Sequence, residues 1–230
     1  MRRLLFLLLS LPLVISCSDK YNIAGNTSQS ILNGKMAYLK EYNENAMKAI
    51  DSCEVVHGKF KMSGILDSVR CVALFMDSES LIPVVLEQGD INIDIVNARI
   101  RISGTPLNDS LYTFLNKRDS LVLILNDLPH RESLMILEGY SEDQIVDEIN
   151  GKANALTMQL DRLETNFITR NFDNVLGVTF FMQLCNDAYK HFGYPTTTPQ
   201  IDEIYGRAPQ TFRDHPDIAR YFRLVNDREE

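Results

Sequence analysis

The cysteines and histidines are the residues whose types could do chemistry if their spacing brought them together. Cys53 and His57 stand four positions apart. On a helix this spacing would bring the thiol and the imidazole together, as a cysteine nucleophile with its base requires. Residues 46–56 read as a strand, however, and there the same spacing separates the two residues by roughly 13 Å. The pattern therefore predicts no cysteine nucleophile.

The other cysteines form no C-x-x-C pair. Besides Cys17, the chain has Cys53, Cys71 and Cys185. Export to an oxidising compartment permits disulfides, and Cys53 and Cys71, both in expected strands, are the pair best placed for one. The alternative is that each is a small buried apolar residue, which is the commoner role of a free cysteine.

The pattern of metal-binding and acid–base residues is equally weak. No two of the four histidines have the H-x-H or H-x-x-x-H spacing that would suggest a zinc site. Acidic residues crowd positions 142–148, where they would favour the positive end of a helix dipole. Calcium-loop, phosphate-loop and nucleophile-elbow motifs do not occur. We therefore expect no enzyme activity, no metal and no cofactor.

Aromatic side chains are the remaining candidates for a binding surface. Five of them could form a platform for a partner or a glycan: Tyr38, Tyr42, Tyr189, Phe192 and Tyr194. The chain has no tryptophan, which weakens the glycan interpretation. The alternative is that these aromatics belong to the core.

The N-terminus reads as a signal peptide over residues 1–16. Two arginines precede an apolar run at 4–15, which is shorter than the ~20 residues of a spanning helix and typical of a secretory signal. The ending Leu-Val-Ile-Ser-Cys at 13–17 resembles a lipobox. Cys17 is therefore expected to be acylated, with palmitate or similar chains, and to become the new N-terminus. The alternative is an ordinary signal peptide with an incidental cysteine.

Lipid on Cys17 would place the protein at a membrane, because two or more acyl chains anchor a protein stably. Asp19, two residues later, resembles the export tags of surface lipoproteins in Bacteroidetes. We expect an outer-membrane location, and both the periplasmic face and the cell surface stay open.

The charge balance limits the partners. Removing Arg2 and Arg3 with the signal takes the formal net charge from −8 to −10. Nucleic-acid binding starts from a basic patch, and anionic lipid attracts basic segments, so neither is an expected partner of the protein surface. The expected partners are the membrane, through its lipid anchor, and another envelope protein.

Two kinds of periodicity divide the chain near residue 107. Eight short segments before this point alternate or are bounded by turn residues, as in an antiparallel β-sandwich or open barrel. The expected strands are 21–25, 35–40, 46–56, 59–63, 68–76, 81–86, 91–95 and 98–103. His57-Gly58 is the expected hairpin turn between the third and fourth.

Helical periodicity follows residue 107. Asn108 or Asp109 is a candidate N-cap, a second helix is expected over 141–171 with a plausible break at Gly151, and a third over 175–189. Further helices are expected after Pro199 and near 214–216. The predicted fold class is α+β, with a β-rich domain at 17–107 followed by a helical segment of about four helices at 108–230.

Six short motifs occur in an order that resembles a known family. They are Tyr21-x-Ile23-x-Gly25, Ile50-Asp51-Ser52, Gly58-Lys59-Phe60, Gly64, Leu86-Glu87-x-Gly89-Asp90-Ile91 and Gly104-Thr105-Pro106-Leu107-Asn108. Together they resemble the DUF4369 domain, a β-rich module of Bacteroidetes lipoproteins. In many of its relatives a helical segment and a thioredoxin-like domain follow, and residues 171–177 look like that helical linker.

What the resemblance implies is limited by one departure. The chain has no C-x-x-C motif, so no catalytic residue can be carried over, and the resemblance implies an accessory module. The preferred hypothesis is a membrane-anchored, non-catalytic interaction module of the cell envelope. The second is an accessory component of a thiol–disulfide redox system that works with a separate thioredoxin-like protein. The third is a lipoprotein that binds a small ligand or glycan.

Overall fold

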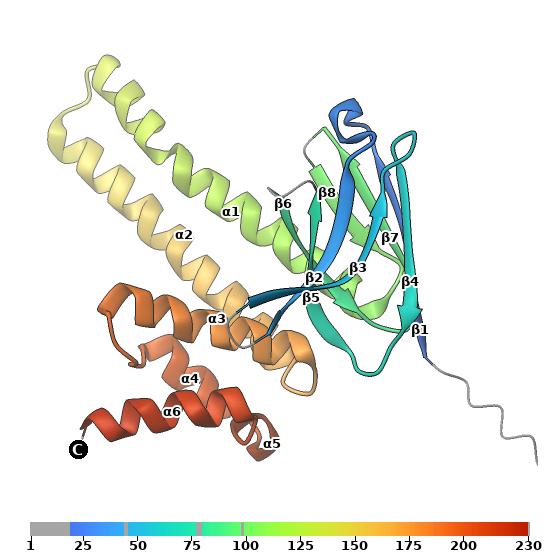
Figure 1. Cartoon of the computed structure of the whole chain (residues 1–230). Helices are drawn as coiled ribbons and strands as arrows, with labels where there is room; N and C mark the ends of the chain where they lie inside the picture. The colour runs from blue at the N-terminus through green and yellow to red at the C-terminus, as the bar shows by residue number, and fades with distance from the viewer. Residues whose placement is uncertain (1–18, 44–45, 77–79, 98, 230) are drawn as a thin grey trace, which may run out of the picture.

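The computed structural model describes residues 19–43, 46–76, 80–97 and 99–229, and it shows a β-sandwich followed by a helical region (Figure 1). Cys17 and the expected signal peptide lie outside these residues. Within the described part, no helix is both long enough and apolar enough to cross a membrane.

The predicted α+β class is confirmed. The strands are β1 Lys20–Thr27, β2 Met36–Asn43, β3 Ala46–Glu54, β4 Lys59–Ile65, β5 Arg70–Met76, β6 Ser80–Leu86, β7 Gly89–Val96 and β8 Arg99–Ser103. The helices are α1 Pro106–Leu137, α2 Glu142–Arg170, α3 Val175–Phe192, α4 Pro199–Arg207, α5 Gln210–Arg213 and α6 Pro216–Glu229, and a short 3-10 turn covers Ser30–Leu32. The described helical region thus has six helices rather than about four.

The strands form two four-stranded sheets with the orders β4-β1-β7-β8 and β3-β2-β5-β6. Alternate residues of β1, β4 and β7 point into the space between the sheets, as Ile91 and Ile93 of β7 do with no exposed surface. The expectation of a purely antiparallel module was wrong at one place, because β1 and β7 pair in parallel. The chain passes through the second sheet between these strands, so it can return in the same direction.

The predicted tight turn at His57-Gly58 is confirmed, but the predicted hairpin was wrong, because β3 and β4 belong to different sheets. His57 and Gly58 both have positive φ angles, 51° and 70°, as the central residues of a type I′ turn do. Val56 and Lys59 flank the turn and exchange main-chain hydrogen bonds of 2.9 and 3.0 Å. The turn joins β3 of one sheet to β4 of the other.

Helix α1 begins two residues before the predicted cap. Its first free N–H groups, those of Leu107 and Asn108, donate to the carboxylate of Glu87 at 2.8 and 3.0 Å. Glu87 follows β6 and is 7% exposed. The cap prediction was wrong because this carboxylate, 20 residues earlier in the chain, takes the place of a local capping side chain.

The helices share a core with the sandwich. Phe114 of α1 and Phe167 of α2 stack with ring centroids 4.0 Å apart, and Phe180 of α3 meets both rings edge-on at 5.1 Å. This aromatic group lies in the same apolar cluster as the strands. A second cluster joins α3 to α4, α5 and α6.

Helices α1 and α2 form a long antiparallel pair that extends away from the sandwich (Figure 1). Arg118 and Glu164 link them by an ion pair of 3.1 Å. The break expected at Gly151 is absent, because α2 runs through this residue without interruption. Gly151 is exposed and costs the helix only its propensity.

Candidate functional site

The two sheets end on the same side of the sandwich, with β6 at the edge of one sheet and β8 at the edge of the other. Helix α1 begins between them and contacts both strands. Helix α1 forms hydrogen bonds with the edge of β6 but none with the edge of β8, and this difference creates the candidate site.

Helix α1 closes the edge of β6. The side-chain amide of Asn108 accepts from the N–H of Val85 at 3.0 Å and donates to the carbonyl oxygen of the same residue at 2.8 Å. The hydroxyl of Tyr112 donates to the carbonyl oxygen of Pro83 at 3.1 Å. Pro83 itself has no N–H to offer. The polar main-chain groups that β6 presents here are therefore occupied.

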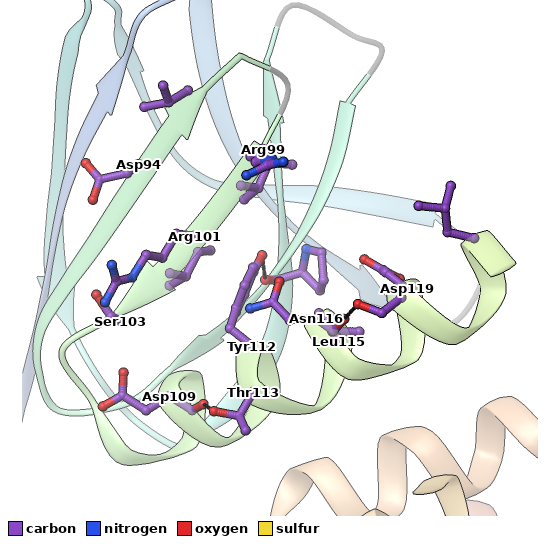
Figure 2. Close-up of a pocket in the computed structure, with 16 residues that line it drawn as sticks. Asp94, Arg99, Arg101, Ser103, Asp109, Tyr112, Thr113, Leu115, Asn116 and Asp119 are labelled. Carbon is purple, nitrogen blue, oxygen red and sulfur yellow. Dashed lines mark hydrogen bonds between the residues drawn. The ribbon is translucent and has the colours of Figure 1, made fainter. Parts of the chain in front are cut away.

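An open groove of about 1320 Å³ lies between β8 and α1 and reaches Pro83 at the edge of β6 (Figure 2). We call it the β8–α1 groove, with strand wall Arg99–Ser103 and helix wall at residues 112–123. Strand β8 pairs with β7, and no hydrogen bond joins its other edge to any described residue. Its groove-side edge therefore keeps free main-chain donors and acceptors.

The strand wall carries two exposed arginines. Arg99 and Arg101 alternate with Ile100 and Ile102, which are half-buried and buried. No described carboxylate lies within ion-pair distance of either guanidinium group. Asp94 is the cross-strand neighbour of Arg101. The two guanidinium groups are thus available to a ligand.

The helix wall is mixed in character. Asn116 and Asp119 are exposed and point toward the groove in Figure 2, and Leu123 beyond them is 71% exposed. Burial, and next the charge of Asp119, raise the pKa of Tyr112, so its hydroxyl stays protonated and remains a donor to Pro83. The lining has no cysteine, histidine or lysine. Its chemistry suits recognition of main-chain and charged groups.

The predicted Cys53–Cys71 disulfide is not formed, because both thiols are free, as is Cys185. Strands β3 and β5 lie on opposite sides of β2, about two strand spacings apart. In the register, Cys53 aligns through Ala37 with Met76, five residues beyond Cys71. The two sulfur atoms therefore cannot meet without a rearrangement of the sheet.

The thiols are poor nucleophiles. Burial raises the pKa of all three, to about 12 for Cys185, which has no exposed surface. Cys71 also accepts a hydrogen bond from the Thr179 hydroxyl at 3.4 Å. Among the described residues, no group of three or more histidine, cysteine or acidic side chains could hold a metal ion.

The five predicted binding aromatics do not share one surface. Tyr38 is half-buried in β2, where Lys40 Nζ lies 5.3 Å from its ring centroid. Tyr189 and Phe192 are exposed at the end of α3. Tyr194 follows α3 and lies under the guanidinium group of Arg228, 3.5 Å from the ring centroid. The side chain of the fifth, Tyr42, is outside the described part of the structure.

Sequence reasoning missed the β8–α1 groove. The available signal was the run Arg99-Ile-Arg-Ile-Ser103, an alternating cationic and apolar strand placed directly before a helix. Such a strand, when it ends a sheet, combines free main-chain groups with free charge.

Comparison with known protein families gives one match. A family model for the domain of unknown function DUF4369 matches residues 21–111. Residues 21–111 are a DUF4369 domain. The resemblance carried by the six short motifs is therefore confirmed. Searches of curated proteins and of solved structures found no match.

The DUF4369 domain takes in the sandwich from Tyr21 onward and ends at Leu111, inside the second turn of α1. Asn108 and the strand wall of the groove belong to it. Asn116, Asp119 and Leu123 on the helix wall lie beyond it. The groove is thus built jointly by the DUF4369 domain and the helical region that follows.

Proposed function

We propose that this protein is a membrane-anchored lipoprotein whose folded part is a non-catalytic interaction module of the cell envelope, and that the β8–α1 groove is its binding surface. The observation that carries this proposal is the contrast between the two sandwich edges. Helix α1 occupies the main-chain groups of β6 at Val85 and Pro83. It leaves those of β8 open beside two arginines that have no carboxylate partner among the described residues.

The anchor in this proposal rests on the sequence. A lipid on Cys17 would hold the module at the outer membrane without any spanning helix. The first described strand begins at Lys20, so the module would stand close to the membrane surface, facing either the periplasm or the outside of the cell. A partner in that compartment is the expected occupant.

Site-specific crosslinking in cells tests the proposal. A photo-crosslinking residue at Asn116, on the helix wall, should capture a partner protein, and mass spectrometry would identify it. The matched control places the same residue at Glu203 of α4, which is also exposed. Capture should depend on the anchor and fall in a Cys17→Ala variant. Equal capture from both positions, or turnover in a panel of hydrolase and thiol-oxidoreductase assays, would contradict the proposal.

A second candidate is an accessory role in a thiol–disulfide system. The chain's own thiols are unsuited to exchange because burial raises the pKa of each. A separate thioredoxin-like protein would have to supply the chemistry, as the usual neighbour of this family suggests. Identification of such a protein in the Asn116 adducts would support this role, and adducts that contain only other proteins would argue against it.

A third candidate is the binding of a small ligand or glycan. The groove volume of about 1320 Å³ exceeds the ~300–1,000 Å³ of most enclosed ligand pockets, which leaves room for a sugar chain. A glycan array probed with the purified chain distinguishes this role, since glycan binding that survives Arg99→Ala and Arg101→Ala would favour it over recognition of a protein.

A further inference from the structure

We infer that the β8–α1 groove binds an extended acidic segment of a partner protein, which adds to the sheet as a strand beside β8. The segment would alternate acidic and apolar side chains. This inference rests on the proposed function and makes it specific, because it names the chemistry and the conformation of the occupant.

The main chain of β8 is open on its groove side. An edge strand directs alternate N–H and C=O groups away from its sheet. On β6 these groups are met by Asn108 and Tyr112. On β8 the groove-side groups meet no described residue. Unpaired main-chain groups beside an open groove are what an added strand requires.

The side chains of β8 determine which partner sequence would fit. A strand added beside β8 would lie about 4.8 Å away, and its side chains would point alternately to the same two faces as those of β8. Side chains on one face would neighbour Arg99 and Arg101, and those on the other would neighbour Ile100 and Ile102. The helix wall continues this second face with Leu115 and Leu123. The partner sequence should therefore alternate between residues that fit arginine and residues that fit an apolar strip.

The charges of Arg99 and Arg101 favour an acidic partner. Carboxylates opposite arginines stabilise a strand pair, and like charges directly opposite destabilise it. Three carboxylates also line the groove. Asp94 lies beside Arg101 in the sheet but accepts a hydrogen bond from Asn26 at 3.3 Å. Asp109 accepts one from the N–H of Gly104 at 3.2 Å, and Asp119 stands on the helix wall. None of the three forms an ion pair with Arg99 or Arg101. Acidic side chains of the partner would therefore lie on the face of the added strand that carries the two arginines.

The same charges argue against a second copy of this chain as the occupant. Antiparallel pairing of β8 with β8 about its central residue would set Arg101 against Arg101. A charged edge of this kind protects a sheet from pairing with itself. The five residues of β8 span about 17 Å, so a partner segment of roughly five to seven residues would fill the strand wall.

Fluorescence anisotropy with defined peptides tests the inference. The probe is a fluorescein-labelled heptapeptide of alternating Glu and Val, titrated with the full chain. We expect it to bind at least about tenfold tighter than a heptapeptide of alternating Lys and Val. Methylation of alternate main-chain nitrogens keeps the charges and can be made in two registers. The register that removes the N–H donors facing β8 should weaken binding about tenfold, and the other register should have little effect. The Arg99→Glu/Arg101→Glu double variant should reverse the preference between the two peptides.

The matched control is Arg223→Glu, another exposed arginine outside the groove, which should bind like the wild type. Circular dichroism confirms that each variant is folded. Equal affinity for both registers of N-methylated peptide and for the unmodified one would overturn strand addition, as would unchanged binding by the double variant. A wild-type dimer whose two β8 strands crosslink to each other would instead make a second copy the occupant.

Failure here is distinguishable from failure of the proposed function. Adducts from Asn116 in cells without any peptide binding would reject the added strand and keep an interaction module. Absence of both would reject the two together.

Discussion

The side-chain amide of Asn108 makes with Val85 the two hydrogen bonds that a neighbouring strand would make, at 3.0 and 2.8 Å. Asn108 has no exposed surface, and its amide also donates to the hydroxyl of Thr105 at 2.9 Å. Helix α1 thereby satisfies the main-chain groups at the edge of β6 in place of a neighbouring strand. This arrangement fixes where α1 leaves the sandwich and therefore how wide the β8–α1 groove is.

Replacement of Asn108 by leucine should lower the free energy of unfolding by about 2–4 kcal/mol, because it leaves the buried N–H and C=O of Val85 without partners. Urea denaturation measures the change. Asn116→Leu in the same helix is the control, since Asn116 is exposed and should change stability by less than about 0.5 kcal/mol. Equal losses in the two variants would show that the amide has no special role.

Alanine at Gly104 and at Gly151 should have opposite effects. Gly104 has a φ of +105° and a Cβ there would clash with the carbonyl oxygen of Asp90, so Gly104→Ala should destabilise the fold by about 1–3 kcal/mol. A Cβ at Gly151 meets nothing within 4 Å, and Gly151→Ala should stabilise α2 by up to about 1 kcal/mol. Thermal unfolding of the two variants would test both signs together.

Stability should fall in alkaline solution, partly through Cys185. Its pKa is about 12 in the folded chain against an ordinary value of 9.0. Below pH 9 both the folded and the unfolded thiol are protonated. Between pH 9 and 12 only the unfolded thiol ionises, so this group lowers the free energy of unfolding by about 1.4 kcal/mol per pH unit.

Urea denaturation of wild type and Cys185→Ala at pH 8 and pH 10.5 isolates that contribution. The variant should be less stable than wild type at pH 8, because Cys185 is fully buried, but its loss of stability between the two pH values should be smaller by about 2 kcal/mol. Parallel losses in the two proteins would show that Cys185 is not responsible.

Truncation of Phe167 should uncouple the helices from the sandwich. This ring stacks on Phe114 and touches Phe180, so Phe167→Ala should cost about 3–5 kcal/mol. Met158→Ala, at a side chain of α2 that is 54% exposed, should be nearly neutral. Hydrogen exchange should show that α1 and α2 lose protection first in Phe167→Ala. A uniform loss across the sandwich would contradict this interpretation.

Strands such as β1, β4 and β7 could be predicted because each of them buries one face. Ile91, Ile93 and Ile95 alternate with exposed or half-buried residues, and the I′ turn at His57-Gly58 is a local signal. The parallel pairing of β1 with β7 could not be predicted, since it depends on which strands become neighbours after the chain has crossed between the sheets.

The groove escaped prediction for a related reason. Whether Arg99 and Arg101 lie at a sheet edge is decided by strand order, and strand order is not encoded in the local pattern. The cap of α1 is likewise non-local, because Glu87 precedes Leu107 by 20 residues. Predictions based on isolated side chains were weaker still, since Cys53 and Cys71 are separated by β2.

Helix α1 also determines what can be cut from this protein as an independent unit. A fragment that stops at Leu111, where the DUF4369 match ends, would keep Asn108 but lose Tyr112, the stack on Phe114 and the rest of a 32-residue helix. The remaining part of α1, residues 106–111, would be too short to stay helical on its own. The edge of β6 would then present free main-chain groups that pair with other chains, as an exposed edge strand does. The C-terminal boundary of the DUF4369 match and the end of the smallest soluble fragment should therefore not coincide.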